Sequence, residues 1–354
     1  MANTATEQPR GNPLSRVPRF GRIPFWRIID EAGVLLSLLI LVAILSSQNE
    51  IFRSSFNMRL IALDAALVGI VAVGQTFVIL TSGIDLSVGS MVAFSGVLLA
   101  GLTTKKGLAF PEEMSPMLNP NIAIPIALLV GTLYGTLQGI IITKLKITPF
   151  IVTLGSMSIL AGLALVLSNA SPVQQLPRSL RWMTTVRGEM PFIGGFDVPL
   201  PMPAMIMLLV YFIAWLLLRY TKLGRYAYAI GGNETATRLS GVKVDRYLIA
   251  IYSFSAFLAS FAGVILAVRL DSGNYTNGET YTLDGVAAAV IGGTSLAGGV
   301  GGVWGTLIGV LIMAVVRNAL VLYEVPSMWH RVVVGGIIVA AVALDAIRKR
   351  LRSK

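Results

Sequence analysis

Residues 60–80 read LIALDAALVGIVAVGQTFVIL, a run in which Asp64 is the only charged residue. A helix needs about 20 mainly apolar residues to cross a bilayer, so this run is long enough for one membrane span. The whole chain has the same character: 55% of its 354 residues are hydrophobic and 13% are charged, against roughly 25% charged residues in a soluble domain. This composition excludes an ordinary soluble enzyme and a disordered chain, and the absence of cysteine excludes a disulfide scaffold.

Nine more apolar runs flank this one, so the sequence predicts an all-α polytopic membrane protein with about ten transmembrane helices. The predicted spans cover residues 32–47, 60–80, 88–103, 122–143, 148–168, 203–218, 247–268, 284–296, 303–323 and 329–347. The eighth run is short and rich in glycine. The first could instead be a secretory signal peptide, but Leu45-Ser46-Ser47 gives no convincing cleavage site, so we expect a retained helix.

The basic residues predict the orientation of the chain. With ten spans, 18 of the 28 Lys and Arg residues lie on one side of the membrane, in residues 1–29, 144–146, 219–246 and 348–354. Because cytoplasmic segments carry the excess of Lys and Arg, both termini are expected in the cytoplasm of a bacterial cell, with the protein in the inner membrane. The same bias accounts for the net charge of +11 without nucleic acid as a partner.

The chain then divides into three parts. A basic cytoplasmic tail (1–29) precedes one transmembrane domain (30–347), and a second basic cytoplasmic tail (348–354) follows it. Within the domain, residues 169–201 are expected to form a long periplasmic loop and residues 219–246 a long cytoplasmic loop.

A short helix is predicted inside the cytoplasmic loop. Asn233 is a favourable N-cap, Glu234 suits the positive end of the helix dipole, and Gly241 suits the position after the last helical residue. About two turns fit between them, a length of roughly 12 Å at 1.5 Å per residue. Gly231 and Gly232 allow a sharp entry into the helix. Taken alone, this pattern also fits an ordinary surface helix that contacts only water.

Residues 231–241 read GGNETATRLSG and resemble the cytoplasmic loop of permease subunits of ribose-type ATP-binding-cassette (ABC) monosaccharide importers, the family of ribose, xylose, galactoside and inositol permeases. Residues 80–90, LTSGIDLSVGS, and residues 283–299, LDGVAAAVIGGTSLAGG, resemble the same family. Residues 148–155, TPFIVTLG, give a weaker fourth match. The four stretches stand in the family order, so the resemblance covers roughly residues 30–347.

The resemblance implies a transmembrane permease subunit that translocates a monosaccharide, such as a ribose-type pentose, a hexose or a cyclic polyol, into the cytoplasm. Besides membrane lipid, it implies three partners: a second permease copy or close homologue, an ABC ATPase with two cassettes, and a periplasmic sugar-binding protein. The short cytoplasmic helix would be the coupling helix that contacts the ATPase. Its residues are Gly231, Gly232, Asn233, Glu234, Thr235, Arg238 and Gly241.

The sequence gives no indication of catalysis by this chain. It contains no Gly-x-x-x-x-Gly-Lys-Ser/Thr motif, so ATP and magnesium are expected in the partner ATPase and no cofactor is expected here. One histidine and no cysteine leave little material for a metal site, so we predict no metal ligands and no catalytic residues.

Ionisable residues within membrane spans are costly and are therefore candidates for function. The set is Asp64, Asp85, Asp284, Arg317 and Asp345. Asp284 and Asp345 are expected at the membrane interface, and Arg317 is expected to extend to the outer surface. For Asp64, near the outer end of its span, a structural and a functional role both stay open.

Asp85 stands at a break between two apolar runs. Ser82-x-x-Asp85 has the spacing of a capping box, and Gly83 can end the preceding helix. The segment is either a tight turn or an unwound stretch whose helix N-terminus offers free N–H groups to sugar hydroxyls. Gly292-Gly293-Thr294-Ser295 form a second break, in the eighth span. In an inverted repeat of spans 2–5 and 7–10, the third and eighth spans are counterparts, and paired broken segments indicate a central pathway.

A neutral sugar needs hydrogen-bonding groups rather than opposite charges. The candidate pathway residues are Gln75, Thr76, Asp85, Ser87, Gly292, Gly293, Thr294, Ser295 and Asn318. For each serine or threonine, the alternative is a hydroxyl bonded to a carbonyl of its own helix.

Two other function classes fit less of the sequence. An ion-coupled secondary sugar transporter usually needs carboxylates or histidines deep in the bundle; only Asp85 and Asp64 could serve, and the capped cytoplasmic helix would have no task. An intramembrane enzyme would need a base or a zinc motif, but the single histidine, His330, begins the tenth span and no His-Glu-x-x-His motif is present.

Overall fold

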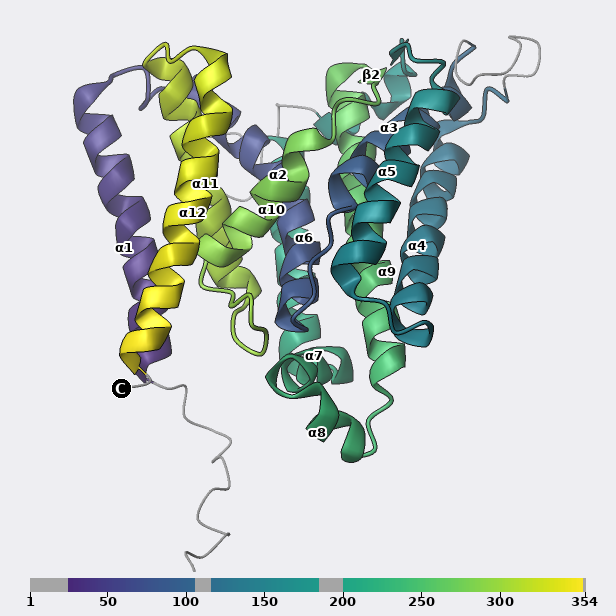
Figure 1. Cartoon of the computed structure of the whole chain (residues 1–354). Helices are drawn as coiled ribbons and strands as arrows, with labels where there is room; N and C mark the ends of the chain where they lie inside the picture. The colour runs from purple at the N-terminus through teal and green to yellow at the C-terminus, as the bar shows by residue number, and fades with distance from the viewer. Residues whose placement is uncertain (1–24, 106–115, 185–199, 353–354) are drawn as a thin grey trace, which may run out of the picture.

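The structure, a computed structural model, describes residues 25–105, 116–184 and 200–352 (Figure 1). Most of the basic N-terminal tail and part of the predicted periplasmic loop lie outside this part of the chain. In chain order, the elements are α1 (Phe25–Gln48), α2 (Ser55–Leu80), α3 (Val88–Thr103), α4 (Pro120–Lys144), α5 (Pro149–Leu167), β1 (Val173–Gln174), the 3₁₀ helix η3 (Arg178–Thr184), α6 (Met202–Tyr220), α7 (Lys222–Gly232), α8 (Glu234–Leu239), α9 (Val244–Leu270), β2 (Ser272–Gly273), α10 (Glu279–Ile291), α11 (Val303–Leu322) and α12 (Ser327–Arg352). The strands β1 and β2 form one short antiparallel pair.

Each of the ten predicted apolar runs contains a helix, so the all-α fold class is confirmed. Within the described residues, six helices are long and apolar enough to cross a membrane: α2, α4, α5, α6, α9 and α11. Helix α3 has 16 residues and α10 has 13, and at 1.5 Å per residue both are shorter than the roughly 30 Å hydrocarbon core of a bilayer. The count of about ten spans therefore stays a prediction.

Helix α2 forms the centre of the bundle, and 94% of its most apolar 18-residue stretch is buried inside the protein. It packs against α6, α9, α10 and α11. A helix that is apolar on every side can be surrounded by other helices or by lipid, and here helices surround it. In Figure 1, α4 and α5 lie on one flank of the molecule, and α1 and α12 lie on the other. The outer face of α4 exposes Leu129 and Leu133, which suits contact with lipid.

Helices α7 and α8 project from one end of the molecule (Figure 1). The predicted cytoplasmic loop 219–246 thus holds two helices where the sequence predicts one. Helix α7 buries Gly224, Ala227 and Ile230, three positions three residues apart, and this short apolar face explains why it forms. Gly231 and Gly232 are expected to form a non-helical entry to the short helix. They instead belong to the last turn of α7.

Two non-helical segments lie at the same end of the bundle as α7. Residues 81–87 separate α2 from α3, and residues 292–302 separate α10 from α11. Both breaks are predicted from the sequence, but α10 runs from Glu279 to Ile291 rather than from 284 to 296. The non-helical residues precede α3 and follow α10, and the inverted repeat stays a prediction.

Candidate functional site

The segment 81–87 is organised by the carboxylate of Asp85, which is 1% exposed. Its Oδ1 atom accepts hydrogen bonds from the Ser87 N–H (2.9 Å) and the Ser87 hydroxyl (2.6 Å). Gln138 of α4 donates from Nε2 at 3.3 Å, and Ser255 of α9 donates to Oδ2 at 3.2 Å. A buried carboxylate is costly unless donors surround it, and here donors come from three parts of the chain.

The predicted capping box is wrong. The Ser82 hydroxyl donates to the Ala297 carbonyl (2.8 Å) instead of capping α3. The residue before α3 is Ser87, and its side chain makes no cap bond. A capping box at Ser82 requires a helix that begins at the next residue, but α3 begins only at Val88. The Asp85 carboxylate instead accepts hydrogen bonds from Ser87.

Side chains from three helices replace helical hydrogen bonds along this segment. The pairs of side-chain donor and backbone carbonyl are Gln75–Asp85 (2.5 Å), Thr153–Ile84 (3.2 Å) and Thr282–Leu86 (3.3 Å). Thr282 also accepts from the Gly89 N–H (3.0 Å). The N–H groups of Ser87 and Gly89 are therefore occupied within the chain, so these two are not free for sugar hydroxyls in this structure, and a sugar-binding role of the segment stays a prediction.

The second segment combines a turn with close helix packing. Gly293 has a φ of +90°, a conformation that favours glycine, and it ends α10. Gly292 lies so close to α11 that an added Cβ would contact the Gly305 carbonyl. Thr294 and Ser295 are buried beside this turn. The predicted glycine break is thus present, and its glycines also allow α10 and α11 to approach.

The two segments meet each other, and α7 meets both. We call this contact the three-way junction; it comprises residues 80–82, 297–301 and 228–232. The bonds that close it run from the Gly299 N–H to the Leu80 carbonyl (2.9 Å), from the Ser82 hydroxyl to the Ala297 carbonyl (2.8 Å) and from the Tyr228 hydroxyl to the Gly301 carbonyl (2.8 Å). At its centre, Gly231 leaves no room for a side chain, because a Cβ there would contact the Leu80 carbonyl.

Helix α8 follows α7 directly. Asn233 caps it by accepting the Ala236 N–H at Oδ1 (2.8 Å), and Gly241 follows it with a φ of +83°, so both predicted local roles are confirmed. The Thr237 hydroxyl donates to the Ala229 carbonyl (2.9 Å), which fixes α8 against α7. Thr235 is exposed on its surface.

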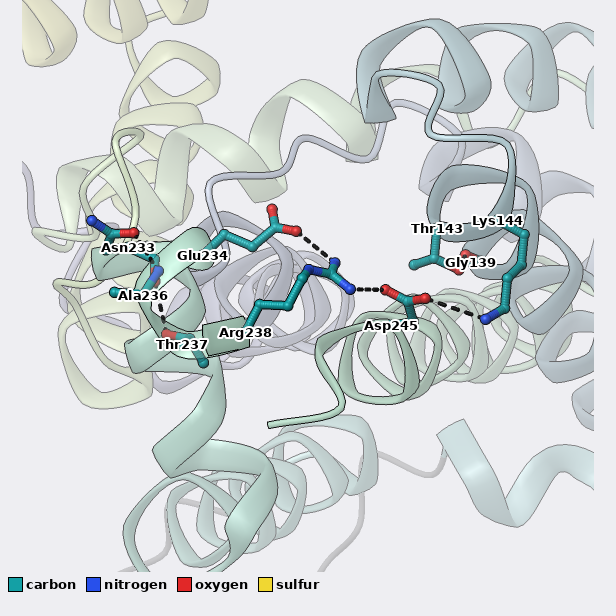
Figure 2. A network of polar contacts seen from close by, with 9 residues as sticks. All are labelled: Gly139, Thr143, Lys144, Asn233, Glu234, Ala236, Thr237, Arg238 and Asp245. Atoms are coloured by element: carbon teal, nitrogen blue, oxygen red, sulfur yellow. Dashed lines mark hydrogen bonds and ion pairs between the residues drawn. The ribbon is translucent and has the colours of Figure 1, made fainter. Parts of the chain in front are cut away.

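Figure 2 shows a chain of charges that connects α8 to the bundle. Arg238 pairs with Glu234 one turn earlier (2.9 Å) and with Asp245 at the start of α9 (2.8 Å). Asp245 also pairs with Lys144 at the end of α4 (3.2 Å). The carboxylates of Glu234 and Asp245 hold the pKa of the Arg238 guanidinium above its usual value by accepting its hydrogen bonds. Arg238 therefore links α8 to α9.

The nine candidate pathway residues do not form one surface. The first segment and the helix before it hold Gln75, Asp85 and Ser87, and the second segment holds Gly292, Gly293, Thr294 and Ser295. Thr76 donates to its own helix at Ala72 (2.7 Å) and contacts the Thr306 hydroxyl (2.8 Å). Asn318 lies apart from these residues and exchanges two hydrogen bonds with Asn57 (2.6 and 3.0 Å).

Three charged residues come together that the sequence places separately. Arg317 pairs with Asp284 and lies 3.9 Å from Asp64. Asp284 is only 2% exposed, so its side chain faces the protein interior, and Arg317 turns toward it rather than lying free in solvent. The expected place of Asp284 at the membrane interface and the extension of Arg317 toward the outer surface stay predictions. Pairing across α2, α10 and α11 offsets the cost of burying these charges. The prediction for Asp345 concerns a side chain outside the part that the structure describes.

Comparison with known proteins agrees with the resemblance in the sequence. The family model described as "Branched-chain amino acid transport system / permease component" matches residues 57–342. The ribose import permease protein RbsC of Bacillus subtilis is 44% identical over 324 residues, which cover 92% of this chain and 95% of that protein. No solved structure gives a significant match to the chain.

Two further relatives carry the names of other sugars. The galactose/methyl galactoside import permease protein MglC of Salmonella typhimurium is 34% identical over 326 residues, 90% of this chain and 95% of that protein. The D-allose transport system permease protein AlsC of Escherichia coli is 33% identical over 325 residues, 91% of this chain and 93% of that protein. With its six apolar helices, this similarity makes the chain an integral inner-membrane protein and a transport subunit rather than an enzyme. The chain belongs to the ABC transporter permeases and, among them, to the ribose-type sugar permeases.

Proposed function

We propose that this chain carries a neutral monosaccharide from a periplasmic binding protein across the inner membrane into the cytoplasm. The substrate class is a ribose-type pentose, a hexose or a cyclic polyol, in keeping with the ribose, galactose and allose permeases among its relatives. ATP hydrolysis in a separate subunit drives the transport. Both termini, α7 and α8 lie on the cytoplasmic side.

The working complex contains three kinds of partner. Two permeases, identical or closely homologous, form the pathway; an ABC ATPase with two cassettes binds to their cytoplasmic face; and a sugar-binding protein docks outside. ATP and magnesium belong to the ATPase, since this sequence has no phosphate-binding Gly-x-x-x-x-Gly-Lys-Ser/Thr motif.

Helix α8 is the coupling helix of this proposal, and the three-way junction is the observation that supports it. A displacement of α8 passes to α7 through the Thr237–Ala229 hydrogen bond. Helix α7 in turn contacts both broken segments, through Tyr228 and Gly231. One movement at the ATPase therefore acts on both segments at once.

The two segments form the cytoplasmic barrier of the pathway. Gln75, Thr76, Asp85 and Ser87 line one side of this barrier, and residues 292–295 line the other. In this proposal, the hydrogen bonds that join the two segments, from Gly299 to Leu80 and from Ser82 to Ala297, hold the barrier closed. Breaking them opens the route for the sugar. Asn318 belongs to the outer half of the pathway. An ion-coupled mechanism has less support, because the four hydrogen bonds from Ser87, Gln138 and Ser255 already occupy the Asp85 carboxylate.

The test is reconstitution of the complete importer. The permease, the ATPase and the binding protein are placed in vesicles, and uptake of labelled D-ribose, D-galactose and D-allose is measured with ATP on the ATPase side. Uptake is expected only when all three proteins and ATP are present. Uptake by the permease alone under a sodium or proton gradient contradicts the proposal.

A further inference from the structure

A cavity of about 640 Å³ opens at the end of the bundle opposite α7 and α8. Its walls come from the first turns of α2, α10 and α12, the end of α9 and the last turns of α11. We call it the outer cavity. Three carboxylate and three guanidinium side chains line it: Asp64, Glu279, Asp284, Arg269, Arg317 and Arg331. The rest of the wall includes His330, Asn318 and apolar side chains such as Leu60 and Val321. Its volume lies within the roughly 300–1,000 Å³ of small-molecule sites in proteins.

The polar groups of the outer cavity are held in place. Asp284 is 2% exposed and is paired with Arg317, whose side chain is 23% exposed. The Asp64 carboxylate of α2 lies 3.9 Å from the Arg317 guanidinium and adds a second negative charge to the pair. Asn318, also in the wall, is fixed by its two hydrogen bonds to Asn57. Carboxylate, guanidinium and amide groups from three helices thus face one space in a fixed arrangement.

The charges of the outer cavity suit a neutral polyhydroxyl ligand. The three formal negative charges cancel the three positive ones, so the wall gives no net attraction for an anion or a cation. Each sugar hydroxyl both donates and accepts, and neighbouring hydroxyls match the paired oxygens of a carboxylate and the paired N–H groups of a guanidinium. A wall that presents both kinds of group can bind such a ligand without a net charge.

Helix α10 connects the outer cavity to the barrier. Asp284 stands in the cavity wall and Gly292 ends the same helix two turns later, about 12 Å away at 1.5 Å per residue. Between them, Gly285 packs against Gln75, the residue that holds the Asp85 carbonyl. Helix α10 therefore joins the cavity wall to the residue that holds the segment 81–87.

We infer that the outer cavity is a monosaccharide-binding site of the permease itself, in which Asp64, Arg317 and Asn318 contact the sugar before the barrier opens and the buried Asp284 holds Arg317 in place. This inference rests on the proposed function, which requires a sugar to enter at this end. It assigns sugar recognition to the permease in addition to the separate binding protein.

The absence of cysteine from the chain allows a direct test. Thr280 and Leu283 line the outer cavity and are exposed, whereas Thr276 is exposed in the loop before α10 and lies outside the cavity wall. The variants Thr280→Cys, Leu283→Cys and Thr276→Cys are reconstituted in vesicles together with the ATPase. Their reaction with a membrane-impermeant maleimide is followed from outside, with free D-ribose, D-galactose or D-allose added and the binding protein omitted.

Sugar is expected to slow the reaction at positions 280 and 283 and to leave position 276 unchanged. At a concentration about four times the dissociation constant, the slowing is about fivefold, because the rate falls as 1/(1 + [L]/Kd). Equal rates with and without every sugar, up to the solubility limit, overturn the inference. Slowing at all three positions also overturns it, since a site confined to the cavity protects only its wall.

A second pair of variants separates this inference from the proposed function. Leu283→Trp fills the outer cavity and is expected to lower sugar uptake to the level of the ATP-free control. Leu129→Trp, on the exposed face of α4, is expected to keep wild-type uptake. Normal uptake by Leu283→Trp overturns the cavity site and leaves the importer intact. Failure of the wild-type complex to transport any of the three sugars removes the proposed function instead, whatever the labelling shows.

Discussion

At the scale of single residues, the structure distinguishes neighbours that look alike in the sequence. Gly231 and Gly232 stand side by side, but a Cβ at Gly231 would contact the Leu80 carbonyl and the Gly299 N–H, whereas nothing lies within 4 Å of a Cβ at Gly232. Arg317 and Arg331 both face the outer cavity, but only Arg317 has a fully buried partner. Each pair gives a variant and its matched control.

We predict that Gly231→Ala disrupts the three-way junction and that Gly232→Ala does not. Adding one methyl group to a closely packed site costs about 1–3 kcal/mol, whereas an exposed substitution stays within about 0.5 kcal/mol. Thermal unfolding of the purified protein, followed by its five tryptophans, gives the stability, and reconstituted uptake gives the function. Similar melting curves and uptake for both variants contradict the close packing described for Gly231.

We predict that Arg317→Ala is far more damaging than Arg331→Ala. Removing Arg317 leaves Asp284 buried without its partner, a change that costs about 3–5 kcal/mol in comparable sites. The Arg331–Glu279 pair has side chains that are 77% and 64% exposed, and such pairs contribute about 1 kcal/mol or less. The unfolding midpoint in detergent measures both effects. The double variant Arg317→Met with Asp284→Leu removes both charges and is expected to recover most of the lost stability. If the double variant is as unstable as Arg317→Ala, Arg317 stabilises the protein through contacts other than its pair with Asp284.

At the scale of helices, the sequence predicts most of the fold because long apolar runs have few alternatives in a membrane. The cap at Asn233 and the left-handed Gly241 are also predictable, since both depend on local chemistry. Helix α7 is missed because its buried face consists of a glycine, an alanine and an isoleucine, a weak apolar signal. The donors that surround Asp85 are missed for another reason: Gln138 and Ser255 lie 53 and 170 residues away, beyond any local pattern.

The same limit hides the partners of the charged residues within the apolar runs. Read alone, Arg317 is expected to extend toward water, because nothing near it in the sequence provides a negative partner. The packing of α10 and α2 against α11 supplies Asp284 and Asp64. The one available signal is that opposite charges occur in different apolar runs, which suggests pairing without saying which residues pair.

We predict that the local stability of α8 controls coupling rather than assembly. Asn233→Ala removes the cap and costs about 1 kcal/mol of helix stability, and Gly241→Val adds strain because a β-branched residue disfavours a positive φ. Asn233→Asp keeps a capping oxygen and serves as the control. Uptake and ATP hydrolysis are measured together in vesicles with all partners.

Asn233→Ala and Gly241→Val are expected to lose sugar uptake. Their ATP hydrolysis is expected to be either absent or no longer stimulated by the loaded binding protein. Asn233→Asp is expected to retain both activities. If a flexible Gly-Ser sequence in place of residues 231–241 supports normal uptake and normal stimulated hydrolysis, α8 is not the coupling helix.

At the scale of the whole molecule, the two ends of the helix bundle differ in structure. One end carries α7 and α8 (Figure 1) together with the three-way junction, and the other carries the outer cavity, which residues at the opposite ends of α2, α10 and α11 line. The proposed orientation, with α8 in the cytoplasm, rests on the distribution of basic residues. It requires that the junction be the inner barrier and that the cavity face the periplasm.

We predict this orientation for the intact protein. A reporter that is active only in the periplasm is expected to give no signal when fused after Lys354 and a strong signal when fused after Lys105, at the end of the third predicted span. A reporter active only in the cytoplasm should give the reverse pattern, because the excess of Lys and Arg keeps the first and last segments inside. A strong periplasmic signal at Lys354 refutes the even number of spans.

The pairing of an open outer cavity with a closed junction also determines where the membrane voltage falls. In the proposed orientation, the cavity shares the electrical potential of the periplasm, so the voltage drops mainly across the inner half of the protein. Moving one elementary charge through 100 mV corresponds to about 2.3 kcal/mol, and the electric field in this thinner layer is steeper than in the surrounding lipid. In the proposed mechanism, the close glycine contacts of the junction would then block ions as well as sugar between cycles, so that the cell would not lose its ion gradients through a resting importer.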